Sequence, residues 1–223
     1  MKGGICAVFD IDDTLYLERD YVRSGFEAVG RWAAKRIHVQ DFAERCWRRF
    51  GAGRRGSIFD EVLRESGRQP APELISALVE VYRTHTPSIA LAADASEALS
   101  EISHNVSIAV VSDGPGASQS RKVEALGLES LAAPIVLTEL YGSEFRKPHP
   151  RAFEQVMHCR PASVYLYVAD NPVKDFAAPR QLGWVTVRVR RPCGLQYAVE
   201  NAEVTPDCEM ADCSRLPEVV AQM

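Results

Sequence analysis

Five short apolar runs, separated by stretches with helical character, constrain the fold of this chain more than any other feature of its sequence. The runs are Ile5–Phe9, Ser107–Ser112, Ile135–Thr138, Val164–Ala169 and Val185–Val189. Each is rich in β-branched residues and apolar along most of its length, which is typical of strands buried on both faces of a parallel sheet. The alternation of such strands with helices predicts an α/β fold built on a doubly wound parallel sheet.

Four segments between and after the later runs have the length and apolar spacing of crossover helices. They are Asp94–Ile102, Gln119–Ala125, Arg151–His158 and Asp175–Leu182. Gly127 and Gly183 follow two of these segments and are natural helix stops, because glycine adopts the left-handed conformation that ends many helices. A further short helix is expected at Pro217–Ala221.

The long segment after the first run interrupts this alternation, because it shows helical periodicity only. Apolar residues at helical spacing include Val22, Phe26, Val29 and Ala33. Ser57 followed by Asp60 predicts a capping box at the start of a later helix. About four helices are thus inserted after the first strand, enough for a small bundle of their own.

The insertion predicts two domains. Residues 1–15 and 94–223 are expected to form the α/β core domain, and residues 16–93 an all-helical cap domain. The insertion follows the carboxyl end of a strand, and open α/β sheets bind their ligands at that edge. We therefore expect the site of function at the carboxyl edge of the sheet.

Composition and charge exclude several classes of protein. Thirty acidic and 26 basic side chains give a net charge of −4, which argues against a protein that coats nucleic acid. The longest apolar run, Leu131–Leu137, is far shorter than the roughly 20 residues of a membrane helix, and Asp10 arrives before a signal-peptide core could form. The six cysteines form no CxxC pair, so free thiols are expected. These features predict a cytoplasmic monomer or homodimer with no nucleic-acid or membrane partner.

Three carboxylates directly follow the first apolar run, at Asp10, Asp12 and Asp13. Such a group is costly beside a buried strand unless positive charge meets it. Asp10 and Asp12 are two residues apart and can be directed to one point, and a hard divalent cation such as Mg²⁺ prefers oxygen ligands. The alternative is an acidic loop in which Asp13 or Thr14 caps the following helix.

Further polar residues follow the other runs. They are Ser112-Asp113-Gly114, Lys147 between Arg146 and Pro148, Asp170-Asn171, and Asp175. A hydroxyl followed by backbone amides freed by glycine makes a small anion-binding nest, and a lysine suits a phosphate oxygen. Taken singly, Ser112 and Asp175 are possible helix caps and Lys147 a surface charge. Taken together, they place acid, hydroxyl, ammonium and acid at one edge of the sheet.

In this order the motifs resemble those of the haloacid dehalogenase superfamily. They are Val8–Leu15, Val110–Gly114, Lys147-Pro148, and Val168–Asn171 with Asp175. The resemblance covers essentially the whole chain, and it implies a Rossmann-like core with a helical cap between the first and second motifs. One departure is Ala169, where glycine is common in the family.

The resemblance also implies roles for the motif residues. Asp10 would attack phosphorus to give an aspartyl-phosphate, and Asp12 would protonate the leaving oxygen and then activate water. Mg²⁺ would be bound by the Asp10 carboxylate, the Asp12 main-chain carbonyl and Asp170, with Asp175 acting through water or on Lys147. The phosphoryl group would be bound by the nest and its lysine: Ser112, Asp113, Gly114 and Lys147.

Two features separate the reactions known in this family. Carbon–halogen hydrolases of this kind lack the second aspartate, so Asp12 favours phosphate chemistry. Phosphonate hydrolases use a cap lysine, and here the cap has only Lys35, at the end of its first helix. We therefore expect a Mg²⁺-dependent phosphatase for a small phosphorylated metabolite, either a sugar phosphate or a nucleotide-type monoester. The alternatives are a phosphomutase and a catalytically idle binding protein of the same fold.

The insert carries five arginines within eleven residues: Arg45, Arg48, Arg49, Arg54 and Arg55. Arg54 and Arg55 lie between two glycines and are predicted to grip a second anionic group of the substrate. The alternative is a solvated basic face whose side-chain stems cover apolar surface. Tyr16, expected at the entrance, and Asn171 are further substrate-binding candidates, whereas Arg188, Arg190 and Arg191 are expected at the surface.

Overall fold

The computed structural model describes residues 4–200 and 204–223. The chain divides into two compact units, one formed by residues 1–19 and 89–223 and the other by residues 20–88. We call them the core unit and the helical unit. The domain boundaries expected from the sequence, at 15/16 and 93/94, lie a few residues from these divisions. The first division falls inside α1, and the second falls in the segment between α4 and α5.

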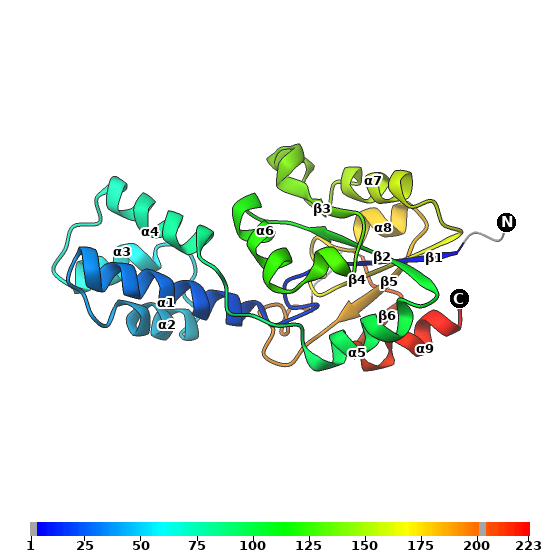
Figure 1. Cartoon of the computed structure of the whole chain (residues 1–223), viewed down its shortest axis with the longest axis horizontal. Helices are drawn as coiled ribbons and strands as arrows, with labels where there is room; N and C mark the ends of the chain where they lie inside the picture. The colour runs from blue at the N-terminus through cyan, green and yellow to red at the C-terminus, as the bar shows by residue number, and fades with distance from the viewer. Residues whose placement is uncertain (1–3, 201–203) are drawn as a thin grey trace. The chain divides into compact units, whose positions relative to one another are not determined.

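Among the described residues, one sheet of six parallel strands runs through the core unit, in the order β3-β2-β1-β4-β5-β6 (Figure 1). The strands are β1 (Ile5–Phe9), β2 (Val106–Ser112), β3 (Ile135–Leu137), β4 (Val164–Ala169), β5 (Val185–Val189) and β6 (Cys208–Met210). The predicted doubly wound parallel fold is confirmed. The sequence did not predict β6, because three residues with Glu209 at their centre make no apolar run.

Helices cover both faces of this sheet: α7 (Arg151–Cys159) and α8 (Ala177–Gln181) lie on one side, and α5 (Ala93–Ile102) and α9 (Leu216–Ala221) on the other (Figure 1). A further helix, α6, spans Gly116–Ala125 and begins earlier than predicted. Helix α8 begins later than predicted, because Asp175 belongs to the turn before it. Short 3₁₀ turns occupy Leu128–Ser130, Thr138–Tyr141, Ser143–Phe145 and Cys213–Arg215.

Strand β1 lies in the middle of the sheet and pairs with β2 and β4. Its side chains alternate between the two faces, and those from Cys6 to Phe9 are buried. Cys6 and Val8 belong to the same apolar cluster as Phe153 of α7 and Trp184, whose rings meet edge to face at 5.5 Å between centroids. Burial of a large apolar side chain contributes roughly 1.5–3 kcal/mol, so this packing fixes the strand that leads into Asp10.

The helical unit contains α1 (Glu18–Arg36, which starts in the core unit), α2 (Phe42–Gly51), α3 (Ile58–Glu65) and α4 (Pro72–Thr84). Its interior is aromatic, with Phe26 edge-on to Phe50 and Phe59. Gly25 lets α1 approach α4, because a Cβ there would lie 2.5 Å from the Tyr82 ring. The capping box predicted at Ser57 is wrong, since the Ser57 side chain makes no capping hydrogen bond.

The prediction that Arg188 and Arg191 lie at the surface is also wrong. Both are buried, because each guanidinium has its charge and donors satisfied inside the core unit. Arg191 forms a bidentate pair with Asp94 at 2.9 and 2.7 Å and donates to the Thr14 carbonyl at 2.9 Å. It thereby ties the loop after β1 to α5.

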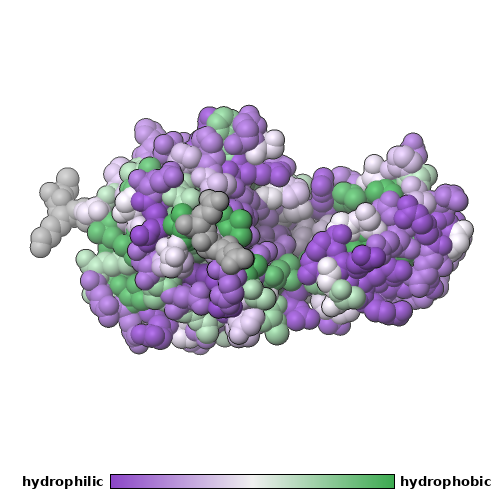
Figure 2. Space-filling model, turned by 180° about the vertical axis from the view of Figure 1, so that it is seen from behind, coloured by the Kyte–Doolittle hydropathy of each residue, from purple (hydrophilic) through white to green (hydrophobic). Residues whose placement is uncertain are grey.

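The surface is mostly hydrophilic on the face shown in Figure 2. Large hydrophobic side chains that are exposed in the described part of the chain are Leu131, Leu140, Val173, Tyr197 and Met223. Over the same residues, no helix combines the length and the apolar character that a membrane-spanning segment requires.

Candidate active site

Asp10 is the first residue after β1, and the sheet fixes its backbone. Its amide donates to the Val168 carbonyl of β4 at 2.9 Å, and the residue is 4% exposed. Its carboxylate accepts a hydrogen bond from Lys147 Nζ at 2.6 Å. The sheet therefore presents a buried carboxylate at its carboxyl edge, next to a buried ammonium group.

Lys147 joins groups from several elements. Its Nζ lies 2.6 Å from Asp10, 2.7 Å from Asp175 Oδ1 and 3.0 Å from the Tyr167 hydroxyl of β4. The Lys147 side chain is fully buried. Burial opposes its charge, but Asp10 and Asp175 outweigh burial and raise the pKa of Lys147 well above its usual value. Lys147 is thus a fixed cation.

The carboxylates around Lys147 carry more negative charge than it neutralises. Burial, with a further contribution from Asp175, raises the pKa of Asp10 to about 6 against the opposing effect of Lys147. Burial, Asp175 and Asp10 together raise the pKa of Asp170 well above its usual range. Such crowding of carboxylates is the usual sign of a functional site.

This donor set suits a hard divalent cation, because excess carboxylate charge and oxygen ligands are what Mg²⁺ requires. Among the described residues, no three His, Cys, Asp or Glu side chains converge as direct ligands of one ion. The ligand set expected from the sequence has only two side-chain carboxylates, from Asp10 and Asp170, completed by a main-chain carbonyl. The residues present therefore fit the ion without a third carboxylate.

The carboxylate of Asp12 faces a different set of groups. It accepts hydrogen bonds from Lys122 Nζ at 2.7 Å on both oxygens, from the Tyr16 hydroxyl at 2.5 Å and from Gln119 Nε2 at 3.1 Å. Burial opposes ionisation, but the Lys122 charge and these hydrogen bonds outweigh it and lower the pKa of Asp12. Asp10 and Asp12 therefore differ in environment, as two carboxylates with different chemical tasks require.

The loop that carries both carboxylates turns sharply at Asp13, which has a positive φ of 51°. Asp tolerates this conformation better than most residues. The Asp13 carboxylate accepts the amides of Glu18 at 2.8 Å and Leu195 at 2.6 Å. Because Glu18 is the first residue of α1, the Asp13 carboxylate caps that helix, as the alternative interpretation of this loop predicted. Asp10 and Asp12 remain available for other roles.

Ser112, the last residue of β2, and Gly114, in the loop that follows, lie at the same edge. Ser112 is buried and its hydroxyl donates to Gln119 Oε1 at 3.1 Å. Gly114 has φ +134°, and a Cβ there would lie 2.6 Å from Gln119 Nε2. Glycine is thus required both for the backbone conformation and for the approach of Gln119.

Asp113 of the same loop has its side chain directed elsewhere. Its carboxylate accepts from the Thr138 hydroxyl at 2.6 Å and from the Lys147 amide at 3.2 Å, and Lys174 Nζ lies 3.4 Å away. An anion in this position does not bind phosphate through its side chain. Its contribution to the predicted anion nest would come from its main-chain amide, while its side chain holds the Lys147 loop.

The loop after β4 is held by its own side chains and by a buried arginine. The Asn171 amide donates to Asp175 Oδ2 at 2.9 Å, and Asn171 Oδ1 accepts from the Val173 amide at 3.0 Å. Arg188 Nε donates to the Asp170 carbonyl at 3.1 Å. The side-chain oxygen of Asn171 therefore stabilises the turn that places Asp170 and Asp175.

The remaining substrate candidates have structural contacts of their own. Tyr16 is 1% exposed and its hydroxyl is on Asp12, so it does not line an open entrance. Arg54 and Arg55 are exposed residues of the helical unit. Arg54 Nε lies 3.7 Å from Glu61, whereas Arg55 donates to the Phe50 carbonyl at 2.9 Å and stacks over the Phe50 ring at 4.0 Å.

Sequence reasoning did not single out Lys122, Gln119 or Lys174. Lys122 and Gln119 lie three residues apart on α6, on one helix face, and both are buried. In the sequence they read as ordinary polar positions of a helix. A signal was available, because they follow the Ser112 motif at the start of the next helix.

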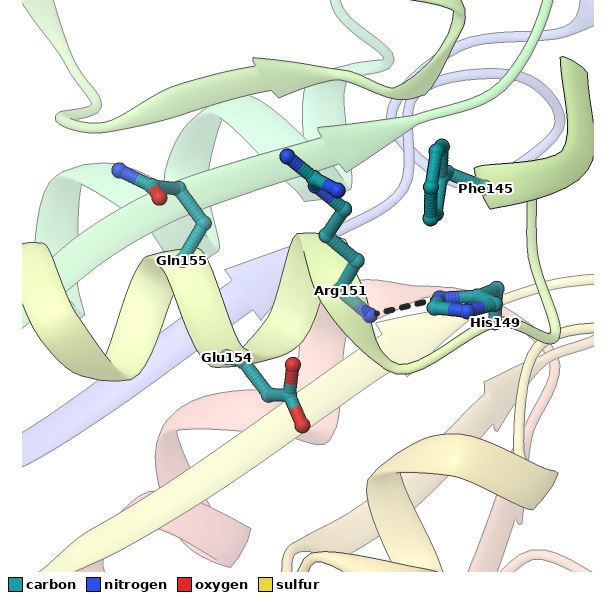
Figure 3. Close-up of a pocket in the computed structure, with 5 residues that line it drawn as sticks. All are labelled: Phe145, His149, Arg151, Glu154 and Gln155. Atoms are coloured by element: carbon teal, nitrogen blue, oxygen red, sulfur yellow. Dashed lines mark hydrogen bonds between the residues drawn. The ribbon is translucent and has the colours of Figure 1, made fainter. Parts of the chain in front are cut away.

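A surface pocket of about 340 Å³ lies beside the Lys147 loop, lined by Phe145, His149, Arg151, Glu154 and Gln155 (Figure 3). His149 Nδ1 accepts from the Arg151 amide at 3.1 Å, and its ring meets Phe145 edge to face. The carboxylates described above do not line this pocket. His149 thus packs the loop that positions Lys147.

Comparisons with known proteins find a family model and curated relatives that match this chain. The family model of the haloacid dehalogenase-like hydrolases matches residues 6–183. A curated relative named glyceraldehyde 3-phosphate phosphatase, from Methanopyrus kandleri, is 26% identical over 229 residues, with 97% of each chain covered. A relative of the same name from Methanocaldococcus jannaschii is 25% identical over 195 residues, which cover 82% of this chain and 83% of that protein.

Among solved structures, a 2-haloacid dehalogenase from Pseudomonas syringae pv. Tomato DC3000 has the same fold. Its TM-score is 0.67 and its identity 22%, over 100% of this chain and 99% of that chain. At this identity the likeness concerns the fold alone.

Proposed function

The chain belongs to the haloacid dehalogenase-like hydrolases, and within that family we propose that it is a phosphatase for a small phosphorylated metabolite. The observation that carries the proposal is the pair of carboxylates on one loop with different partners. The Asp10 carboxylate accepts a hydrogen bond from Lys147, whereas the Asp12 carboxylate accepts hydrogen bonds from Lys122, Gln119 and Tyr16. A nucleophile and a separate acid–base group are what hydrolysis of a phosphate ester through a covalent intermediate requires.

In the first step, Asp10 attacks phosphorus and the bond from phosphorus to the ester oxygen breaks. Asp12, whose pKa is lowered in the free protein, takes up a proton as the negatively charged ester binds beside it and donates that proton to the departing oxygen. The oxygen leaves as an alcohol, and the phosphoryl group stays on Asp10 as an aspartyl-phosphate. In the second step Asp12 accepts a proton from water as the water attacks phosphorus. Inorganic phosphate is released and Asp10 is restored.

Charge stabilisation comes from groups that the fold holds in place before substrate arrives. Lys147 and the Ser112 hydroxyl would bind the phosphoryl oxygens, together with the main-chain amides of Asp113 and Gly114. Fixed donors in a buried site stabilise developing charge more than water does. The Asp10 and Asp170 carboxylates and the Asp12 carbonyl would hold Mg²⁺, which when bound supplies charge neutralisation for the transferring group.

We assign the helical unit the role of a cap that selects the substrate, because it is inserted directly after the strand that carries Asp10. Both curated relatives are named for glyceraldehyde 3-phosphate. This supports a small sugar phosphate as the substrate class, with glyceraldehyde 3-phosphate as the first compound to test.

The function is tested by measuring inorganic phosphate release from a panel of phosphorylated metabolites, with Mg²⁺ present and after exhaustive chelation. We expect release from small sugar phosphates that chelation abolishes and added Mg²⁺ restores, because the excess carboxylate charge requires a cation. Conversion of a sugar phosphate to its isomer without phosphate release would indicate a phosphomutase instead. Binding of phosphate esters without any turnover would indicate an idle binding protein.

A second prediction concerns Arg54 and Arg55 as ligands of a remote anionic group. The Arg54→Ala, Arg55→Ala variant should lower kcat/KM for 3-phosphoglycerate about 10- to 100-fold, as expected for loss of charge-assisted hydrogen bonds. Glyceraldehyde 3-phosphate carries an aldehyde in place of the carboxylate, so the kcat/KM of the variant for this substrate should equal that of the wild type. Equal losses on both substrates would point to damage to the helical unit, where Arg55 contacts Phe50. No loss on either would identify both arginines as solvated surface.

A further inference from the structure

Helix α6 directs two buried polar side chains at Asp12. Lys122 is 3% exposed and Gln119 is 2% exposed. Lysine is almost never buried to this degree unless it is paired, and the partner of Lys122 is the Asp12 carboxylate, with 2.7 Å to each oxygen. The Asp12 carboxylate, which comes from the loop of the nucleophile, thus helps to offset the cost of burying this ammonium.

Gln119 connects two parts of the site through one amide group. Its Oε1 accepts from the Ser112 hydroxyl at 3.1 Å, while its Nε2 donates to Asp12 Oδ2 at 3.1 Å. Both ends of the amide are therefore used, so its orientation is fixed. Gly114 leaves the space that this amide occupies, because a Cβ at that position would lie 2.6 Å from Gln119 Nε2.

With Tyr16 on Oδ1, both Asp12 oxygens are held by donors from two elements, the loop after β1 and helix α6. A carboxylate with this many donors has one preferred rotamer. Proton transfer to a departing oxygen needs such a fixed position, since a displacement of about 1 Å can cost about 10²-fold in rate.

We infer that Lys122 and Gln119 are positioning residues that hold the Asp12 carboxylate for proton transfer and, through Gln119, keep it in register with the phosphate-binding hydroxyl of Ser112. The inference rests on the proposed function, because it assigns to these residues a role in the same reaction. Neither residue contacts the transferring group. Lys122 acts through Asp12, and Gln119 acts through Asp12 and Ser112. Loss of the contacts to Asp12 affects the steps that need a proton.

The test uses Lys122→Met and Gln119→Leu, which keep side-chain size and remove the donors. Arg121→Met is the matched control, because Arg121 is the neighbouring cation on α6, is exposed on the helix surface and pairs with Glu124. Each variant is assayed on p-nitrophenyl phosphate, whose leaving oxygen needs little protonation, and on an alkyl phosphate, whose leaving oxygen needs it fully.

Lys122→Met should lower kcat/KM on the alkyl phosphate about 10- to 100-fold and change kcat/KM on the aryl phosphate by less than about threefold. This ratio reports formation of the aspartyl-phosphate, whereas kcat also includes the attack of water that both substrates share. The KM for the alkyl phosphate should be nearly unchanged, because no binding contact is removed. Gln119→Leu should also affect the alkyl phosphate more than the aryl phosphate, with an additional loss on both substrates because the Ser112 hydroxyl loses its partner. Arg121→Met should match the wild type. In an Asp12→Asn background the effect of Lys122→Met on kcat should vanish, because residues that act through one group are not additive.

Several results would overturn the inference. One is an equal loss of kcat/KM on both phosphates in both variants, and another is a loss that persists in the Asp12→Asn background. If Lys122→Met does not fold, Gln119→Leu decides, and failure of both to fold would assign the two side chains to the fold alone. An active wild type with Lys122→Met equal to Arg121→Met contradicts only this inference. A wild type inactive on every phosphate ester contradicts the proposed function and the inference with it.

Discussion

Asp10→Asn is expected to abolish phosphate release, with a loss in kcat of at least about 10³-fold, because an amide cannot attack phosphorus. The fold should survive. Burial, with Asp175, raises the pKa of Asp10 to about 6 in the folded chain, so above its unfolded pKa the ionised carboxylate opposes folding. At pH 7 the neutral amide removes that opposition, and Tm should hold or rise. The measurement is phosphate release together with a thermal melt.

The matched control for this variant is Asp20→Asn, an exposed change in α1 that should leave activity unaltered. An Asp10→Asn protein that keeps more than a few per cent of wild-type turnover would refute the nucleophile assignment. A collapse of Tm would show instead that the carboxylate is needed beside Lys147 for the fold.

Asp12→Asn is the second large change. It should lower kcat on an alkyl phosphate by about 10²–10⁴-fold, the usual contribution of a general acid–base. The loss should shrink as the leaving group improves, because a good leaving group departs without protonation. Rates across a series of aryl and alkyl phosphates measure this dependence on leaving-group pKa.

Asn keeps the shape of Asp12, and its Oδ1 can still accept from Lys122. The variant also removes a negative charge beside that buried ammonium, so a thermal melt accompanies the rates to separate lost proton transfer from lost stability. A loss of kcat/KM of the same size for every leaving group would contradict the role of Asp12 as the acid in the first step. In that case Asp12 would act only in the attack of water on the aspartyl-phosphate.

The sheet was predictable from sequence because strands buried on both faces are continuous apolar runs. The five runs correspond to β1 to β5, and the long helical segment corresponds to α1 to α4. Strand β6 was not predictable, since Cys208–Met210 is short and half polar, and pairing with β5 alone defines it. From sequence, Arg188 and Arg191 were expected at the surface. In the structure they are buried and form ion pairs with Glu209 and Asp94, respectively.

The sequence by itself determined which chemistry the carboxyl edge of the sheet can carry, because strand order and turn residues place Asp10, Ser112, Lys147 and Asp170 at the ends of local elements. Each of these follows a strand or occupies a proline-framed loop, so its position depends on short-range pattern. The tertiary structure alone decided which carboxylate faces which cation. Lys147 contacts Asp10 and Asp175, and Lys122 contacts Asp12, across separations of 137, 28 and 110 residues in the chain. Short-range sequence patterns cannot predict such contacts, because the contacts form only once the sheet and α6 have packed.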